Sequence, residues 1–538
     1  MFTIGHNFID SFQNTMIELS SIQKDINIYK FADWIGIQTD IGRESLIKRL
    51  TISSWISDIK LLTLMSDRFT AVKRAIDDNP SAISEIKNIF RELASIEASI
   101  TSLTDNKTKI ESETYGELFF MKNYSAHLNF IPYLLSVWMF FRIYILPGMS
   151  VILPLIVLII PYIFMKYLFK IPIKFSSYFS ILQAVLSGNI SSIIHGGGEN
   201  GPSHIPEYTM QSIVKGAWVL VPIIQSIIQP YWTFKHLKEV ENIIGDNGEK
   251  VQLLNNIYNR LTICLEKYGG IIMFTNPLPQ FATYKEGVAN ILLNPVYFKY
   301  LLKILGQIEV IVCLASCKYI SPVHWISTMN NQCAIVQIDG AFDYNIAETG
   351  RKTFSVDFTD RHHSLLTGPN KGGKSTILRA LVLSSLLAHT YGCATCTRCS
   401  MTPFNNLFVC LKPEDLPGSI SRFEREIKFT STTLKTRSSE RSLVFIDELF
   451  QSTNPPDALE SCKIYCNHLW KMSNVVSMIS THIFTLVENA NEDVVQCLCC
   501  TAKQNGEDVV FTHLLEPGIC KVSSVHTILR ENGMRITL

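Results

Sequence analysis

The sequence contains few charged residues for its length. Of its 538 residues, 18% are Asp, Glu, Lys or Arg, whereas soluble domains usually contain about 25%. The 48 basic and 47 acidic residues nearly cancel, so the net charge of +1 excludes capture of nucleic acid by the field of the whole chain. A hydrophobic share of 47% excludes a disordered or fibrous protein and supplies enough apolar residues for several cores.

The sequence also lacks the features of a secreted protein. Residues 1–12 contain neither a basic start nor a long apolar run, so we expect no signal peptide. The 14 cysteines are then expected to be reduced thiols. We interpret the regularly spaced Cys393, Cys396 and Cys399 as small buried residues in strands and turns. The alternative is a metal site, which would need a fourth ligand from the candidates Cys497, Cys499 and Cys500.

Charge is absent above all from one segment. Between Asn123 and Met165 the only charged residue is Arg142. The apolar runs 126–147 and 149–166 are each long enough to cross about 30 Å of hydrocarbon as a helix. The dipeptide Pro147–Gly148 between them predicts a turn.

Residues 121–175 are therefore predicted to form an apolar helical hairpin. A transmembrane pair with both ends facing the cytosol is favoured, because Lys122 precedes the segment and lysines follow it. A hairpin buried in a large soluble core is the alternative. It stays open because Arg142 and the prolines at 132, 154 and 161 fit a membrane span poorly.

Helical and α/β patterns divide the chain. Apolar residues recur at helical spacing over 36–120, with a break at Asn79–Pro80, and again over 205–320. From about Cys333, short β-branched runs alternate with helical stretches, as in α/β architecture. Residues 196–203 predict a flexible loop, and 213–232 a buried or interfacial helix. We expect two halves of a helical core at 1–120 and 176–335, separated by the hairpin at 121–175, and an α/β domain at 336–538.

One segment has the pattern of a phosphate-binding loop. Residues 368–376, Gly-Pro-Asn-Lys-Gly-Gly-Lys-Ser-Thr, fit G-x-x-x-x-G-K-[ST]. A strand is predicted before the loop, over 364–367, and a helix after it. Glycines let backbone N–H groups turn toward phosphate oxygens, and the helix N-terminus adds the positive end of its dipole. We expect Lys374 to bind the β- and γ-phosphates and the Ser375 hydroxyl to bind Mg²⁺.

A second, acidic strand is expected in such a protein, and one is present. Residues 442–446, Ser-Leu-Val-Phe-Ile, predict a buried parallel strand that is followed by Asp447 and Glu448. Asp447 is expected to hold the magnesium ion, and Glu448 to polarise the attacking water as a general base. A third strand, predicted over 475–480, precedes His482, which we expect to sense the γ-phosphate or position water. A strand-end histidine with only local hydrogen bonds is the alternative.

Together these residues resemble the MutS family. The loop 368–376 looks like the family's Walker A motif, and the resemblance is strong over 340–538 and weaker over most of the remainder. The other matching pieces are Ser421, Phe423 and Glu426 of the signature Ser-x-Phe-x-x-Glu, Asp447–Glu448–Leu449 with Thr453, Ser480–Thr481–His482, the closing segment 515–534, and more faintly Thr39–Gly42 and the helix 304–319.

The resemblance implies an α/β P-loop ABC-type ATPase domain preceded by a mostly α-helical lever domain. It implies a dimer that hydrolyses ATP with Mg²⁺, in which Ser421 reaches the γ-phosphate bound by the other subunit. The implied nucleotide-binding residues are Gly368, Pro369, Asn370, Lys371, Gly372, Gly373, Lys374, Ser375, Thr376 and Asp447. The implied catalytic residues are Glu448, Lys374, His482 and Ser421, and the implied magnesium ligands are Ser375 and Asp447.

Three departures from the family pattern narrow the hypotheses. The loop after the acidic strand is Gly-rich in the family, but here residues 450–456 read Phe-Gln-Ser-Thr-Asn-Pro-Pro. Roughly 35 residues precede the predicted helical core, so we expect the mismatch-recognition domain to be absent, as in short members of the family. The apolar segment lies where the family inserts a DNA clamp, which should be basic to neutralise phosphates.

Two hypotheses follow. The first is a membrane-anchored ATPase, attached through residues 126–169 with its ATPase domain facing the cytosol, that couples closure to a partner or to DNA. The second is a soluble DNA-binding ATPase of mismatch repair or recombination, in the cytoplasm or nucleus, with the hairpin buried. The expected partners are a second MutS-like subunit, identical or related, double-stranded DNA, and in the first hypothesis a membrane.

Overall fold

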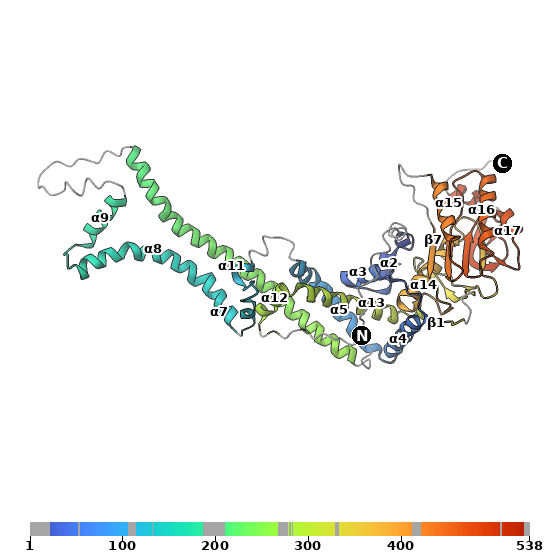
Figure 1. Ribbon diagram of the computed structural model, residues 1–538, viewed down its shortest axis with the longest axis horizontal. Coiled ribbons are helices and arrows are strands. Elements are labelled where there is room, and N and C mark those ends of the chain that lie inside the picture. The colour runs from blue at the N-terminus through green and yellow to red at the C-terminus, as the bar shows by residue number, and fades with distance from the viewer. Residues whose placement is uncertain are drawn as a thin grey trace. The chain divides into compact units, whose positions relative to one another are not determined.

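The structure is a computed structural model of the chain (Figure 1). The chain divides into two compact units: the first comprises Met1–Ser95, Asn259–Thr275 and Tyr300–Leu538, and the second Ile96–Tyr258 and Asn276–Lys299. The loop predicted at 196–203 lies outside the described residues. The structure describes residues 22–51, 54–105, 115–131, 133–186, 210–266, 278, 281, 283–328, 333–411, 421–505, 508–523 and 525–531.

The first unit contains two β-sheets. One has the strand order β3-β2-β6-β1-β5, and the other has the order β11-β10-β4-β9-β8-β7. In the six-stranded sheet all neighbours pair in parallel except β10 and β11, which form an antiparallel hairpin. The strands are β1 (Ser321–Trp325), β2 (Val336–Ala341), β3 (Phe354–Asp357), β4 (His363–Thr367), β5 (Cys393–Ala394), β6 (Arg398–Met401), β7 (Asn406–Cys410), β8 (Ser442–Ile446), β9 (Val475–Ser480), β10 (Val495–Asn505) and β11 (Asp508–Pro517).

The centre of the six-stranded sheet is buried on both faces. Every residue of β4, β8 and β9 is buried, as the continuous apolar runs predict for parallel strands covered by helices. Because these strands are parallel neighbours, their carboxyl ends lie at the same edge of the sheet. Near them in the sequence lie α14 (Lys374–Tyr391), α15 (Arg422–Thr433), α16 (Pro455–Leu469), α17 (Phe484–Glu488) and α18 (Val525–Glu531), and Figure 1 shows α15 and α16 beside this sheet.

The N-terminal helices of the first unit pack against its α/β part. Trp55 Nε1 donates to the Phe404 carbonyl at 2.9 Å, and Ser66 Oγ donates to the Gly392 carbonyl at 2.9 Å. Gly392 has φ of 73°, and a Cβ there would lie 2.7 Å from the Ser66 nitrogen, so glycine alone fits this close approach. The N-terminal helices are α2 (Ile28–Ile35), α3 (Asp40–Arg49) and α4 (Ile59–Asp78), whereas α5 (Pro80–Asp105) and α13 (Pro295–Ser316) have residues in both units. The break predicted at Asn79–Pro80 is confirmed.

The second unit shows that the predicted turn at Pro147–Gly148 is wrong. Residues 134–168 run without interruption through α7 (Leu134–Phe140), the π-helical turn η3 (Phe141–Ile145), α8 (Leu146–Ile163) and the π-helical turn η4 (Phe164–Leu168). Pro147 lies inside this continuous run, directly after the π-helical turn η3, and cannot donate an N–H to the preceding turn. A π-helical turn departs from the regular α-helical hydrogen-bond pattern at this point. The apolar segment is therefore one long helical run rather than a hairpin.

The start of this helical run packs within the second unit. Tyr144 meets Phe234 with ring centroids 5.7 Å apart, and Lys238 Nζ donates to the Tyr144 hydroxyl at 2.8 Å. Both partners lie in α11 (Met210–Glu266), the helix that also contains the apolar run 213–232. The other elements of this unit are η2 (Ala126–Phe130), α9 (Phe175–Leu186) and α12 (Tyr284–Leu293).

Candidate active site

The loop between β4 and α14 lies at the carboxyl edge of the six-stranded sheet. β4 pairs in parallel with β9 on one side and β10 on the other, and α14 begins at Lys374 after Gly373, whose φ is 110°. Gly368 has φ of 150°, and a Cβ there would approach the Cβ and carbonyl oxygen of Cys500 to 3.0 Å. The predicted strand, loop and helix are thus confirmed as elements, and the loop's glycines occupy positions that a side chain would strain.

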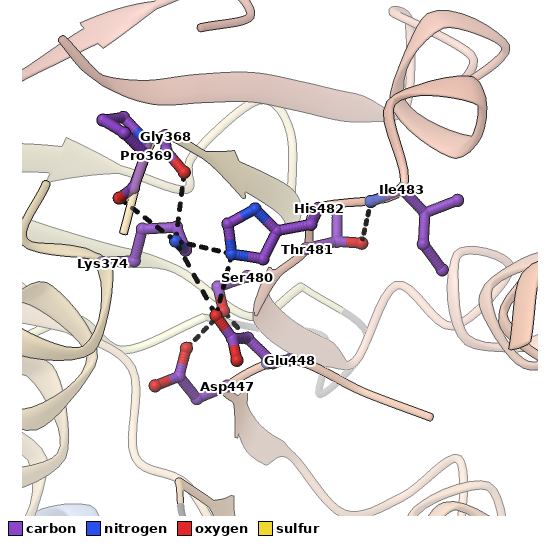
Figure 2. A network of polar contacts seen from close by, with 9 residues as sticks. All are labelled: Gly368, Pro369, Lys374, Asp447, Glu448, Ser480, Thr481, His482 and Ile483. Carbon is purple, nitrogen blue, oxygen red and sulfur yellow. Dashed lines mark hydrogen bonds and ion pairs between the residues drawn. The ribbon is translucent and has the colours of Figure 1, made fainter. Parts of the chain in front are cut away.

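Lys374 lies at the centre of the candidate site (Figure 2). Its side chain is 5% exposed, and its Nζ donates to the carbonyl oxygens of Gly368 at 3.1 Å and Pro369 at 3.4 Å. The same Nζ lies 3.1 Å from His482 Nε2 and 3.8 Å from Glu448 Oε1. The ammonium group is therefore held between the loop and the ends of β8 and β9.

The acidic pair after β8 is fixed by its neighbours in the sheet. The Asp447 N–H donates to the Cys410 carbonyl at 2.8 Å, and the Ser480 hydroxyl donates to the Asp447 carboxylate. The Glu448 N–H lies 3.2 Å from the Ser480 carbonyl and 3.0 Å from its hydroxyl. Glu448 has φ of 57°, a conformation that is uncommon outside glycine and that marks a constrained position.

Glu448 and His482 form the polar contact that faces Lys374. His482 Nε2 lies 2.9 Å from Glu448 Oε1. As an N–H donor this nitrogen bonds the carboxylate, whereas as a lone-pair acceptor it bonds the Lys374 ammonium, so the tautomer of the ring decides between the two. The hydrogen bond from His482, together with the charge of Lys374, lowers the pKa of Glu448 below its ordinary value despite partial burial, and the group is an ionised carboxylate at neutral pH.

Ser421 is the one predicted catalytic residue whose described contact is local. Its hydroxyl caps α15 by accepting from the Glu424 N–H at 3.2 Å, and the residue is exposed. The structure of this single chain therefore brings together Lys374, Glu448 and His482, and leaves Ser421 at a free surface of the first unit.

The sequence interpretation missed two residues of this site. Ser480 was recognised only as part of a strand-end pattern, yet it is bonded to both acidic residues. His513, on β11, has Nδ1 3.2 Å from the carbonyl oxygen of Gly372 in the loop. No local pattern marks His513, because its position depends on the pairing of β10 with both β11 and β4.

The residues present suit magnesium better than a transition metal. Ser375 and Asp447 supply a hydroxyl and a carboxylate, which are hard oxygen ligands, and Mg²⁺ commonly completes its shell with water and phosphate oxygens. Within the described part of the chain, no group of three or more His, Cys, Asp or Glu residues is arranged to hold a metal ion. Cys393 in β5, Cys399 in β6 and Cys396 in the bend between them are buried free thiols, as the interpretation of them as small buried residues in strands and turns expects.

Comparison with protein families agrees with this geometry. The matched region starts within β4, includes the loop, α14, α15 and both acidic residues, and ends after α18. The family model that matches residues 364–532 is MutS domain V, and this match supports membership of the chain in the MutS family.

Proposed function

We propose that the chain binds ATP at the loop 368–376 and hydrolyses it to ADP and phosphate. The observation that carries the proposal is the convergence of Lys374, Glu448 and His482, which come from α14 and from the ends of β8 and β9, on one point beside the loop. The match to MutS domain V supports it, because proteins of that family are ATPases.

Each part of the site has a chemical task in this reaction. Lys374 exchanges its carbonyl partners at Gly368 and Pro369 for oxygens of the β- and γ-phosphates, and the N-terminus of α14 adds its dipole. Glu448 accepts a proton from water as the water oxygen attacks the γ-phosphorus and the bond to the β-phosphate oxygen breaks. His482 holds the Glu448 carboxylate in place. A magnesium ion held by Ser375 and Asp447 would neutralise charge on the phosphates.

A glutamate-to-glutamine substitution tests the general base. Glu448→Gln keeps the size and a carbonyl oxygen but cannot take the proton, so we expect turnover to fall at least 100-fold, in line with the loss of a general base, while ATP still binds. Phosphate release and equilibrium binding of a fluorescent ATP analogue measure the two quantities. Glu492→Gln, at an exposed position, is the matched control. Normal turnover in Glu448→Gln would refute the assignment.

A dimer would give Ser421 its role. The exposed position of Ser421 at the start of α15 supports the proposal that it completes the site of a second subunit. Lys374→Ala and Ser421→Ala should each be inactive or slow alone. Mixed together they should regain activity, because one site of the mixed dimer then has an intact Lys374 and an intact Ser421. No gain on mixing would show that each site is complete within one chain.

We further propose that the apolar run contacts a membrane. Within the described residues one helical stretch, Leu134–Leu153, is long and apolar enough to cross a membrane, and 22% of it is buried inside the protein. Its buried residues are Leu135, Met139, Ile143 and Pro147, which are spaced four apart and so lie on one face of the helix within the second unit.

From Leu146 onward, most of the large apolar side chains that the structure describes are exposed. Neighbouring residues such as Ile152 and Leu153, or Ile159 and Ile160, are exposed together, and neighbours on a helix point about 100° apart, so more than one face is open. Residues 146–168 extend about 34 Å as a helix, enough for about 30 Å of hydrocarbon. These observations favour residues 146–169 as the lipid-facing part.

Carbonate extraction of membranes that contain the full chain tests the attachment. The intact chain should remain in the pellet, and a variant in which 146–169 is replaced by a polar linker should be released while it still hydrolyses ATP. Release of the intact chain would overturn the proposal.

The match to MutS domain V also favours a role in mismatch repair as a second candidate function. In that case duplex DNA should bind with an affinity that falls steeply as salt rises, since phosphate neutralisation releases counterions. DNA should also stimulate ATP turnover. Fluorescence anisotropy with a labelled duplex at two salt concentrations measures the binding, and turnover that is unchanged by DNA would remove this candidate.

A further inference from the structure

The loop after Glu448 contains a residue whose backbone conformation its side chain disfavours. Phe450 has φ of 60°, and its side chain is 1% exposed. A bulky residue in this left-handed region is an outlier that persists only where surrounding contacts hold it. The resemblance described above expects glycine-rich sequence in this loop, and glycine would adopt the conformation freely. The phenylalanine must therefore gain something from packing that glycine could not.

The packing partner is the signature helix α15. The Phe450 ring meets Phe423 edge-on, with centroids 5.8 Å apart and an interplanar angle of 62°. Two residues further on, the Ser452 hydroxyl donates to Glu426 Oε2 at 2.9 Å. Phe423 and Glu426 are three residues apart, which places them on one face of α15.

These two contacts hold the loop against α15, at one end of a short chain segment that includes Glu448. On the other side, the Glu448 N–H is held by Ser480 of β9. Only Leu449, itself buried, separates Glu448 from Phe450. Two left-handed residues, Glu448 and Phe450, thus lie within three positions, between one anchor in the sheet and another on α15. A displacement of α15 would also move Glu448, because the few residues between the two anchors cannot absorb the movement.

We propose that Phe450 and Ser452 are positioning residues that fix the general base Glu448 to α15. The inference rests on the proposed ATPase function. Ser421, the residue proposed to reach a second subunit's nucleotide, caps the start of α15. The contact therefore lets the binding of Ser421 at one site set the position of Glu448 in the other site. Phe450 and Ser452 touch no reacting atom, and they act through the backbone of the loop.

Ser452→Ala is the cleanest test, because Ser452 is exposed and its hydroxyl can be removed without opening a core cavity. We expect kcat to fall about tenfold while KM for ATP changes less than twofold, since misplacing the base affects the transition state and not nucleotide binding. Ser452→Thr keeps the hydroxyl and should retain kcat within about twofold, consistent with one retained hydrogen bond. Thr432→Ala, which removes an exposed hydroxyl from α15, is the matched control.

A double substitution separates coupling from general damage. If the Ser452–Glu426 bond carries the effect, Ser452→Ala combined with Glu426→Ala should lower kcat no further than Glu426→Ala alone. Phe450→Gly and Phe450→Leu provide a second line. Phe450→Leu should keep part of the packing and should lower kcat less than Phe450→Gly does. The melting temperatures of both variants are measured alongside kcat.

The outcomes separate the two proposals. A wild-type chain that hydrolyses ATP, with Ser452→Ala retaining its full kcat, would overturn the positioning role and leave the ATPase function intact. An equal loss of kcat in Ser452→Ala and Thr432→Ala would also overturn the positioning role, because removing any hydroxyl near α15 would then have the same effect. A wild-type chain that neither binds nor hydrolyses ATP would overturn the function itself and this inference with it.

Discussion

Helices α14 and α8 are both apolar, and they have opposite surroundings. From Ala380 to Tyr391, every residue of α14 is buried. In α8, Pro147 is the single buried residue among those whose side chains the structure describes. Hydrophobicity alone would predict that α8 is the more buried helix. α8 is built almost entirely of Ile, Leu, Val and Pro, whereas α14 carries several hydroxyl groups and a histidine.

The polar residues of α14 explain the difference. Three of them are bonded inside the protein: Ser384 bonds Thr395 at 2.9 Å, Ser385 donates to the Leu381 carbonyl at 2.8 Å, and His389 Nδ1 donates to the Ser385 carbonyl at 3.0 Å. A helix that is built for a protein core can contain polar groups because it has fixed partners for them. α8 has few polar side chains, and its Ser150 bonds a carbonyl of its own helix, which supports the proposal that lipid surrounds this helix.

The largest expected effect comes from placing a charge in each helix. Leu387 in α14 is fully buried, so Leu387→Lys should destabilise the first unit by more than about 4 kcal/mol, because a buried ammonium would lack a partner. The apparent melting temperature, followed by tryptophan fluorescence in detergent, measures it. Leu387→Met is the control that preserves volume. A lysine variant that melts like the wild type would show that α14 is not the core helix described here.

The same change in α8 should act on membrane binding instead. Ile156 is 44% exposed and lies near the middle of 146–169, so Ile156→Lys should leave the melting temperature unchanged in detergent. At the centre of a bilayer it should cost about 3 kcal/mol, or roughly 100-fold in partitioning. Flotation with phosphatidylcholine vesicles measures this, with Ile156→Leu as the control. Strong unfolding in detergent would mean that protein, and not lipid, covers Ile156.

Local patterns predicted much of the fold that surrounds the site. The sequence correctly predicted two strands, at 442–446 and 475–480, and the strand, loop and helix around 368–376. Each of these elements is formed by consecutive residues, so its pattern can be recognised without knowing the rest of the fold. The predicted turn at Pro147–Gly148 was wrong because proline and glycine disfavour a helix without excluding it, and here both lie inside a continuous helical run after the π-helical turn η3.

The remaining parts of the site depend on contacts between distant residues. Ser480 reaches Asp447 across 33 positions, through the register of β8 with β9. Phe450 shows the same limit: the sequence reveals a departure from a Gly-rich loop, but its strain and its partner Phe423 become evident only when α15 is placed. Such contacts are set by the topology of the sheet and have no signature in the sequence around either residue.

An intermediate effect is expected from pH. His389 is fully buried against Trp55, with rings 3.9 Å apart, and burial lowers its pKa to about 3. The unfolded chain binds a proton below about pH 6.5 and the folded chain does not, so stability is complete above that pH and falls as the pH is lowered. Between pH 6.5 and 5 this histidine should cost about 2 kcal/mol.

Removing the histidine measures that share of the pH dependence. His389→Gln should make the melting temperature less sensitive to acid over this range, although it lowers stability at neutral pH. His468→Gln is a matched control, because His468 makes the same type of bond, to the Ile464 carbonyl four residues back at 2.8 Å, but is exposed. An unchanged pH slope in His389→Gln would show that the ring is protonated in the folded state or is not buried.

The smallest effect should come from one hydroxyl in each helix. Ser385 in α14 and Ser150 in α8 both donate to the carbonyl four residues back, at 2.8 and 2.9 Å, but Ser385 is buried and Ser150 exposed. Alanine improves helix propensity at both positions by up to about 0.5 kcal/mol. Ser385→Ala also loses a buried hydrogen bond, worth about 1 kcal/mol, so it should be slightly destabilising, while Ser150→Ala should be neutral or slightly stabilising. Melting temperatures of the two variants in detergent measure the difference, and the opposite order would mean that Ser150 has a buried partner and that α8 is a core helix like α14.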